Sequence, residues 1–182
     1  MAALLALYWR VLRLVELLEI TLGVLLLAGV VAAIGAQVVS RYLLGTPLVW
    51  VEEFATYAFI WATFLGTSVG LKRGRQIQIA TFVSGLAPRR EALFRTLAHA
   101  LVLALLVLLA RQALKVMPIE GSSSSVSLPV QLPRDLFYSL PLFVSMVSMA
   151  ATTLYFLAAE LRLAATGERA PHLPQAAEEG IL

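Results

Sequence analysis

The sequence has no cysteine, only two histidines and few charged residues. The lack of cysteine excludes disulfide bridges, thiolate metal sites and thiol nucleophiles. Only 14% of the 182 residues are charged, whereas soluble domains have about 25%. Hydrophobic residues make up 60% of the chain and its mean hydropathy is +0.86, a composition typical of membrane proteins. We therefore expect an all-α membrane protein, because a backbone exposed to lipid must satisfy its own hydrogen bonds.

Four stretches are long and apolar enough to cross a bilayer. A spanning helix needs about 20 mainly apolar residues, and the spans are predicted at about residues 17–44, 51–71, 92–114 and 135–161. They form a single transmembrane domain over residues 1–165, followed by a polar tail over 166–182. The first span is longer than the roughly 7–15 apolar residues of a signal peptide, so we expect it to remain uncleaved.

The basic residues indicate how the chain is oriented. Those in the link between the second and third spans are Lys72, Arg73, Arg75, Arg89, Arg90 and Arg95, against a single glutamate. Loops rich in lysine and arginine stay in the cytoplasm, so both termini are predicted to be cytoplasmic as well. We expect the first five of these residues to form a basic surface against the membrane.

Two segments have the pattern of amphipathic helices that lie on the membrane surface. Residues 3–15 place leucines and valines on one broad side and Arg10 and Arg13 elsewhere, which suits an anionic inner leaflet. In the central link, Ile79, Phe82, Val83 and Leu86 recur at helical spacing. Alternatively, both segments are the first turns of longer spanning helices. The outer link over 116–133 has four consecutive serines and three prolines, which predict irregular structure.

No residue set indicates catalysis or a cofactor. His172 lies in the polar tail, which excludes a bis-histidine haem, and no catalytic triad, zinc-binding helix or phosphate-binding glycine loop is present. His99 could relay protons, or it could bind a helical neighbour one turn from Arg95. The other charged residues fall near predicted span ends, whereas a self-sufficient transporter needs an ionisable group deep in the bilayer. We therefore expect no enzyme, no cofactor, no metal and no transport site.

Small residues recur every four positions on the second span. They are Ala58, Ala62, Gly66 and Gly70. A stripe of this kind lets another helix backbone approach closely. The partner helix could belong to this chain or to a separate subunit.

Several motifs lie between the end of the first span and the third span, and around the start of the fourth. They are Arg41, Gly45, Trp50, Val51, Glu52, Glu53, Trp61, Phe64, Leu65, Gly66, Lys72, Arg73, Gly74, Arg75, Ile77 and Ile79, and the Leu-Pro steps at 132–133 and 140–141. Together they resemble the small permease subunit of tripartite ATP-independent periplasmic (TRAP) transporters, the DctQ-like family. Gln76 stands where the family commonly has a histidine, which argues against a proton-linked role there.

The resemblance implies a division of labour in a bacterial inner membrane. In that family an extracytoplasmic binding protein captures an organic acid, and a large permease subunit carries the substrate and sodium sites. The small subunit supports the large one. The resemblance thus implies a scaffold in sodium-coupled import of an organic acid such as a dicarboxylate. The partners would be the large permease, the binding protein and membrane lipids, with no nucleic acid.

The acidic pair Glu52 and Glu53 opens the second span. Unpaired N–H groups and the positive helix end favour negative charge there. Arg41 lies across a short turn, so we expect one glutamate to pair with it while Trp50 anchors at the membrane interface. The other glutamate could contact the large subunit. Alternatively, both glutamates are solvated.

The predicted interface combines these features with the small-residue stripe. Its residues are Arg41, Trp50, Glu52, Glu53, Ala58, Trp61, Ala62, Gly66 and Gly70. Two other functions remain open. The chain could be a stand-alone small transporter or exporter, or it could anchor an unrelated complex in the membrane.

Overall fold

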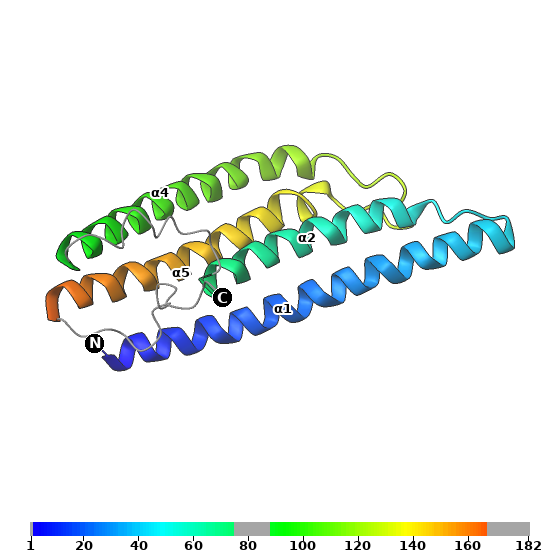
Figure 1. Ribbon diagram of the computed structural model, residues 1–182. Helices are drawn as coiled ribbons and strands as arrows, with labels where there is room; N and C mark the ends of the chain where they lie inside the picture. Colours follow the sequence, from blue (N-terminus) through cyan, green and yellow to red (C-terminus); the bar gives the residue numbers. More distant parts are fainter. Residues whose placement is uncertain (1, 75–87, 167–182) are drawn as a thin grey trace.

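Four long helices make up most of the protein (Figure 1). The computed structural model describes residues 2–74 and 88–166. The helices are α1 (Ala2–Val39), α2 (Trp50–Lys72), α4 (Pro88–Gly121) and α5 (Ser139–Thr166), with a π-helical turn η1 (Ser40–Leu44) and a 3-10 turn η2 (Arg134–Leu136). All four long helices contain a segment long and apolar enough to cross a membrane. The predicted all-α fold with four potential spans is confirmed.

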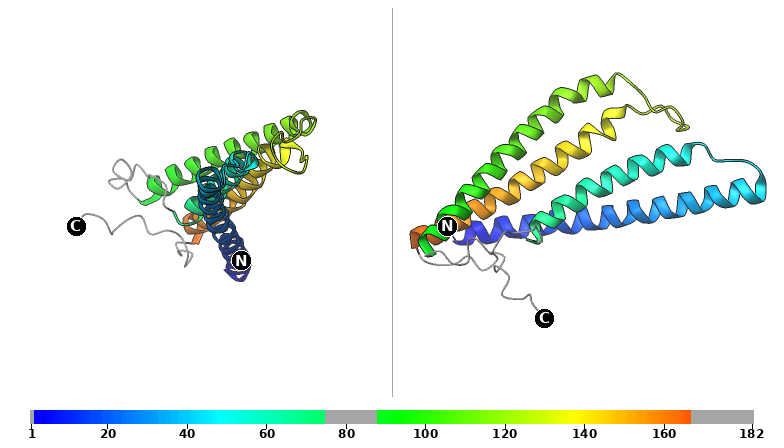
Figure 2. Two further views of the ribbon diagram at one scale, coloured as in Figure 1. Left: turned by 90° about the vertical axis from the view of Figure 1, so that its right-hand side faces the viewer. Right: turned by 45° about the horizontal axis from the view of Figure 1, so that its top comes forward.

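The helices lie side by side in a row, in the order α1, α2, α5, α4 (Figures 1 and 2). The pairs α1–α2 and α5–α4 converge at the end where α1 begins and α5 ends, and they diverge toward the opposite end (Figure 2). The two inner helices are more buried. Of the residues in the apolar segment of each helix, 33% are buried in α2 and 44% in α5, against 6% in α1 and 11% in α4. A row of this kind leaves broad apolar faces on α1 and α4 for lipid or other proteins.

Helix α1 is continuous and unusually long. Its 38 residues correspond to about 57 Å, nearly twice the roughly 30 Å hydrocarbon core of a bilayer. Residues 3–15 form its first turns without a break, so they are not a separate helix, and their place at the membrane surface stays a prediction. The amphipathic pattern of the central link, with Ile79, Phe82, Val83 and Leu86, lies outside the described residues.

A left-handed glycine reverses the chain between α1 and α2. Gly45 has φ of 70°, and its N–H and that of Thr46 donate to the Ser40 carbonyl. The Ser40 hydroxyl donates to the Thr46 carbonyl at 2.5 Å, which closes the turn. Only glycine adopts this backbone conformation without strain. The turn therefore places the start of α2 beside the end of α1.

The link between α4 and α5 is more ordered than its composition predicts. Helix α4 continues through Pro118 to Gly121, so the prediction of irregular structure from residue 116 is wrong for these residues. Pro118 lies in the last turn of α4, where the loss of one backbone hydrogen bond destabilises the helix only a little. Buried Ser125 then organises the rest, because its N–H donates to the Leu132 carbonyl at 2.8 Å and its hydroxyl to the Val130 carbonyl at 3.0 Å.

Candidate functional site

Four side chains from three helices form a buried polar cluster. They are Glu19 of α1, Ser68 and Lys72 of α2, and Ser148 of α5. The Lys72 ammonium donates to Glu19 Oε2 at 2.6 Å, to Ser68 Oγ at 2.9 Å and to Ser148 Oγ at 2.6 Å. Both serine hydroxyls donate to Glu19 Oε1, Ser68 at 3.0 Å and Ser148 at 2.6 Å. Glu19 is only 5% exposed and Lys72 only 4%.

The charges of the buried polar cluster cancel one another. An ammonium has three donors, and all three donors of Lys72 are engaged. Both oxygens of Glu19 accept hydrogen bonds, so neither charge is left without a partner. Such an arrangement holds three helices in one register, because removal of either charge would leave the other buried and uncompensated.

The cluster corrects two predictions. Lys72 was expected on the basic membrane surface, but its side chain turns inward because Glu19 and Ser68 offer it acceptors inside the helix row. Glu19 was expected near a span end with water or lipid headgroups within reach, but its carboxylate is buried among three helices. The next residue, Arg73, keeps an exposed side chain and pairs with Glu16 at 2.7 Å.

The structure describes only part of the remaining predicted basic residues. Arg75 lies outside the described residues, and only the backbone of Arg89 and Arg90 is described, in the first turn of α4. Their place on a basic membrane surface stays a prediction.

At the other end of α2, Glu53 is held by the α4–α5 link. Its carboxylate accepts the backbone N–H groups of Val126 at 3.1 Å, Ser127 at 2.5 Å and Leu128 at 3.0 Å. It also accepts the Tyr57 hydroxyl at 2.5 Å. We call this arrangement the outer clasp. It joins the two helix pairs at the end where they diverge (Figure 2).

Aromatic side chains of α2 reinforce the outer clasp. Tyr57 stacks on Phe137 with ring centroids 3.9 Å apart and planes 3° from parallel, and Tyr138 meets its edge at 5.7 Å. Trp61 donates its indole N–H to the Leu136 carbonyl at 3.0 Å. Trp61, predicted as an interface residue, therefore binds within this chain. Trp50 packs edge-on against Phe54 at 6.2 Å.

The predicted ion pair between Arg41 and the acidic pair is not formed. Arg41 is exposed in η1, and no salt bridge joins it to either glutamate. Glu53 instead takes three amides and a phenol, which together outweigh one exposed ion pair. Glu52 remains exposed, as in the alternative of a solvated acid.

The stripe of small residues on α2 divides into two parts. Ala58 and Ala62 are 4% and 7% exposed, so they pack inside the helix row. Around Gly66 and Gly70, by contrast, a β-carbon would meet no atom within 4 Å. These glycines share one side of α2 with exposed residues at helical spacing, and we call this side the open face of α2. It consists of Thr56, Phe59, Thr63, Gly66, Thr67 and Gly70.

His99 binds within its own helix. Its Nδ1 lies 2.7 Å from the Arg95 carbonyl oxygen, and its ring centroid is 5.7 Å from that of Phe156. The expectation that it bonds a helical neighbour is confirmed. Nearby, Arg95 and the buried Glu160 are 3.8 Å apart.

These features define a helical membrane protein whose described buried charges, Glu19, Lys72 and Glu160, are used to join helices. The family model described as "Tripartite ATP-independent periplasmic transporters, DctQ component" matches residues 30–163. The chain belongs to this family. It is therefore a multi-pass membrane component of a transporter and not an enzyme.

A curated relative agrees with this assignment. The chain is 30% identical over 81 residues to the sialic acid TRAP transporter small permease protein SiaQ of Vibrio cholerae serotype O1. The aligned part covers 44% of this chain and 46% of the relative, so the match spans about half of that protein's length.

Proposed function

We propose that this chain is the small permease subunit of a TRAP transporter in the bacterial inner membrane. It would hold a large permease subunit in place during sodium-coupled import of an organic acid delivered by an extracytoplasmic binding protein. Membership of the family supports the partners, and the basic link after α2 supports an orientation with both termini in the cytoplasm. The relative is named for sialic acid, so we keep the proposed cargo at organic acids and do not narrow it to dicarboxylates.

The main observation that supports the scaffolding role is that the buried charges of Glu19 and Lys72 bind each other. Glu19 and Lys72 neutralise each other and occupy both serines of the cluster, which leaves the ammonium no free donor for a passing anion. Transport sites of secondary transporters typically lie where spanning helices are broken near the midplane. Helix α2 runs without such a break through its predicted span, and the first span changes only in its last turn, the π-helical η1. Both features favour a rigid scaffolding subunit over one that itself conducts a substrate.

We assign the contact with the large permease to the open face of α2. Its small side chains permit close approach of another helix backbone. Its three threonine hydroxyls already donate to carbonyls four residues earlier, at 2.8–2.9 Å, so an apolar partner would leave none of them unsatisfied. Gly66 and Gly70 of the predicted interface lie on this face. Ala58 and Ala62 do not, because they are buried against this chain's own helices.

Co-purification tests both proposals. The tagged chain, expressed with its transporter and extracted in mild detergent, should bring the large permease with it. Gly66→Leu with Gly70→Leu should strongly reduce recovery of the large permease. Gly23→Leu on α1 is the matched control, because a β-carbon at Gly23 would also meet no atom within 4 Å, and it should leave recovery unchanged.

Two results would contradict the proposals. If the chain alone drives solute uptake into liposomes, it is a stand-alone transporter and not a scaffold. If Gly23→Leu and the Gly66 and Gly70 double variant reduce recovery equally, the open face of α2 is not the contact, although the scaffolding role would stand.

A further inference from the structure

The first part of α1 continues past the end of α2. Lys72 and Arg73, at the end of α2, pair with Glu19 and Glu16 of α1, which sets the level at which the two helices part. The preceding residues, 2–15, extend about 21 Å beyond this level. We call residues 2–18 the α1 extension. Figure 1 shows α1 continuing past the end of α2 toward the end of α5.

One side of the α1 extension packs firmly on α5. Leu12 is buried against Tyr155 and Phe156. The Tyr8 hydroxyl donates to the Ala151 carbonyl at 2.7 Å, and the ring of Trp9 lies 5.0 Å from that of Tyr155. These contacts hold the extension in one orientation, so its other side presents a defined surface.

That other side carries an apolar stripe that no described part of the chain covers. Its side chains are Leu4, Leu7, Val11, Leu14 and Leu18, each between 49% and 70% exposed. Spacings of three and four residues place all five on one side of the helix. A stripe of this length needs an apolar environment.

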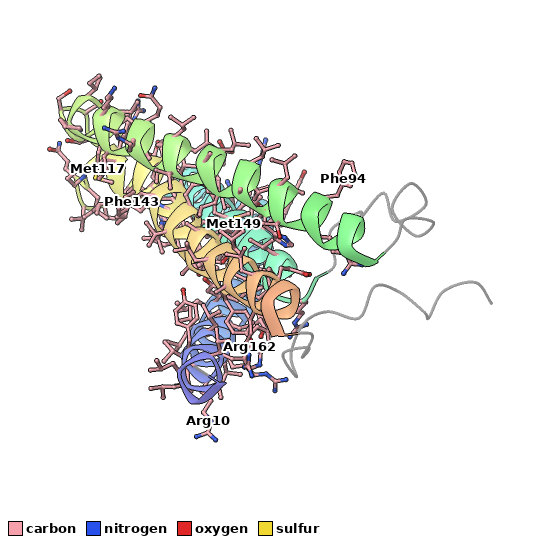
Figure 3. The ribbon with its side chains drawn as sticks, turned by 90° about the vertical axis from the view of Figure 1, so that its left-hand side faces the viewer. Arg10, Phe94, Met117, Phe143, Met149 and Arg162 are labelled. Atoms are coloured by element: carbon pink, nitrogen blue, oxygen red, sulfur yellow. The ribbon has the colours of Figure 1, made fainter. Side chains whose placement is uncertain are left out.

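Two cations lie on the rest of the extension, Arg10 next to the stripe and Arg13 further round the helix. Arg10 and Arg13 are exposed, and neither forms an ion pair within the described chain. Glu16 and Glu19, the acids of the same stretch, are taken by Arg73 and Lys72. Figure 3 shows Arg10 pointing away from the other helices. The α1 extension therefore combines an open apolar side with two positive charges that no acid of the described chain compensates.

We propose that the α1 extension binds the headgroup region of an anionic leaflet. The stripe contacts acyl chains, while Arg10 and Arg13 bind the phosphates of anionic lipids. Water would leave the stripe exposed, and the hydrocarbon core would strand both arginines without partners. The boundary region satisfies both. Residues 19–44 alone correspond to about 39 Å and suffice to cross the core, so the extension is not needed for crossing.

Spin labels can locate the extension, because the natural sequence has no cysteine. Single variants Leu7→Cys, Val11→Cys and Leu14→Cys would be labelled in the full chain in vesicles of phosphatidylcholine and phosphatidylglycerol. These labels should collide freely with oxygen and several-fold less with a water-soluble nickel chelate than a label at Ser123→Cys in the exposed link. Equal collision with the chelate at both places would overturn the proposal.

A charge test identifies the lipid. The shielding of the Val11→Cys label from the chelate should be stronger in vesicles with phosphatidylglycerol than in pure phosphatidylcholine. Arg10→Gln with Arg13→Gln should abolish this difference. Arg111→Gln with Lys115→Gln, two exposed cations elsewhere on α4, is the matched control and should preserve it. An unchanged difference in the first double variant would refute the role of the arginines.

The main alternative is that the large permease, and not lipid, covers the apolar stripe, and labelling the complex distinguishes the two. If the Val11→Cys label loses its collisions with oxygen when the large permease is bound, a protein covers the stripe and the lipid proposal fails. Retained collisions support lipid. This result is independent of the proposed function, because recovery of the complex is measured separately.

Discussion

The Lys72 ammonium lies 2.6 Å from a Glu19 carboxylate oxygen, although 53 residues separate the two in the chain. Their contact ties α2 to α1, and Ser148 adds α5 to the same joint. The outer clasp of Glu53 joins the helix pairs at their other end. Helices in a row bury less of one another's surface than helices in a closed bundle. The two polar joints at opposite ends therefore contribute more to fixing the arrangement of the helices.

Lys72→Met should destabilise the isolated chain by about 3–5 kcal/mol, because it leaves the Glu19 carboxylate buried without its cation. Thermal unfolding in detergent, followed by circular dichroism, measures the loss. Arg73→Met is the control. The Arg73 side chain is 48% exposed, so its pair with Glu16 contributes at most about 1 kcal/mol.

The same experiment extends to the double variant Glu19→Leu with Lys72→Met. It removes both charges and should recover part of the lost stability. A double variant less stable than Lys72→Met alone would show that the two side chains do not act as a pair.

Glu53→Gln should loosen the α4–α5 link. An uncharged amide cannot accept from all three backbone N–H groups and the Tyr57 hydroxyl as strongly as the carboxylate does. Hydrogen bonds to a charged group contribute about 1.5–3 kcal/mol each, so amide exchange at residues 126–128 should accelerate at least about tenfold. Hydrogen exchange read by mass spectrometry measures this.

Glu52→Gln is the matched control for the outer clasp. The Glu52 side chain is exposed, and its carboxylate accepts no hydrogen bond within the described chain. Exchange at residues 126–128 should remain unchanged in this variant. Equal acceleration in both variants would mean that negative charge at the start of α2, rather than the contacts of Glu53, orders the link.

The sequence was sufficient for the fold class but not for the polar contacts. Apolar runs of about 20 residues predict spanning helices because helix length must match the bilayer. Arg41 was expected to pair with Glu52 or Glu53 because only a short turn separates them in the chain. In the structure, the Glu53 carboxylate instead accepts hydrogen bonds from backbone N–H groups of the α4–α5 link, more than 70 residues away. The serine-rich composition of this link did not reveal its backbone geometry.

The buried polar cluster was missed for a related reason. The first span was expected to begin near residue 17, so Glu19 was taken as a span-end residue with water or headgroups within reach. In the structure the preceding residues pack on α5, and the Glu19 side chain is enclosed between α1, α2 and α5. The available signal was the spacing of Ser68 and Lys72, which are four residues apart and so lie on one side of α2.

Gly45→Ala should destabilise the chain by about 1–2 kcal/mol, because φ of 70° strains any residue with a β-carbon. Gly35→Ala should have the opposite sign or no effect. Gly35 lies inside α1, where a β-carbon would meet no atom within 4 Å and alanine favours the helix by about 0.5–1 kcal/mol. Thermal unfolding of both variants under one condition measures the contrast, and two equal losses would refute the role of the turn.

Ala62→Leu and Gly66→Leu should separate folding from assembly. Ala62 is buried inside the helix row, so a larger side chain should cost the isolated chain about 1–3 kcal/mol through overpacking. Gly66 has open space around it, so its variant should unfold at or above the wild-type temperature when the chain is alone. Thermal unfolding of the isolated chain and recovery of the large permease, measured on the same two variants, test this. A loss of stability in Gly66→Leu would place the open face of α2 inside this chain's own packing. Lost recovery at full stability would place it against a separate subunit.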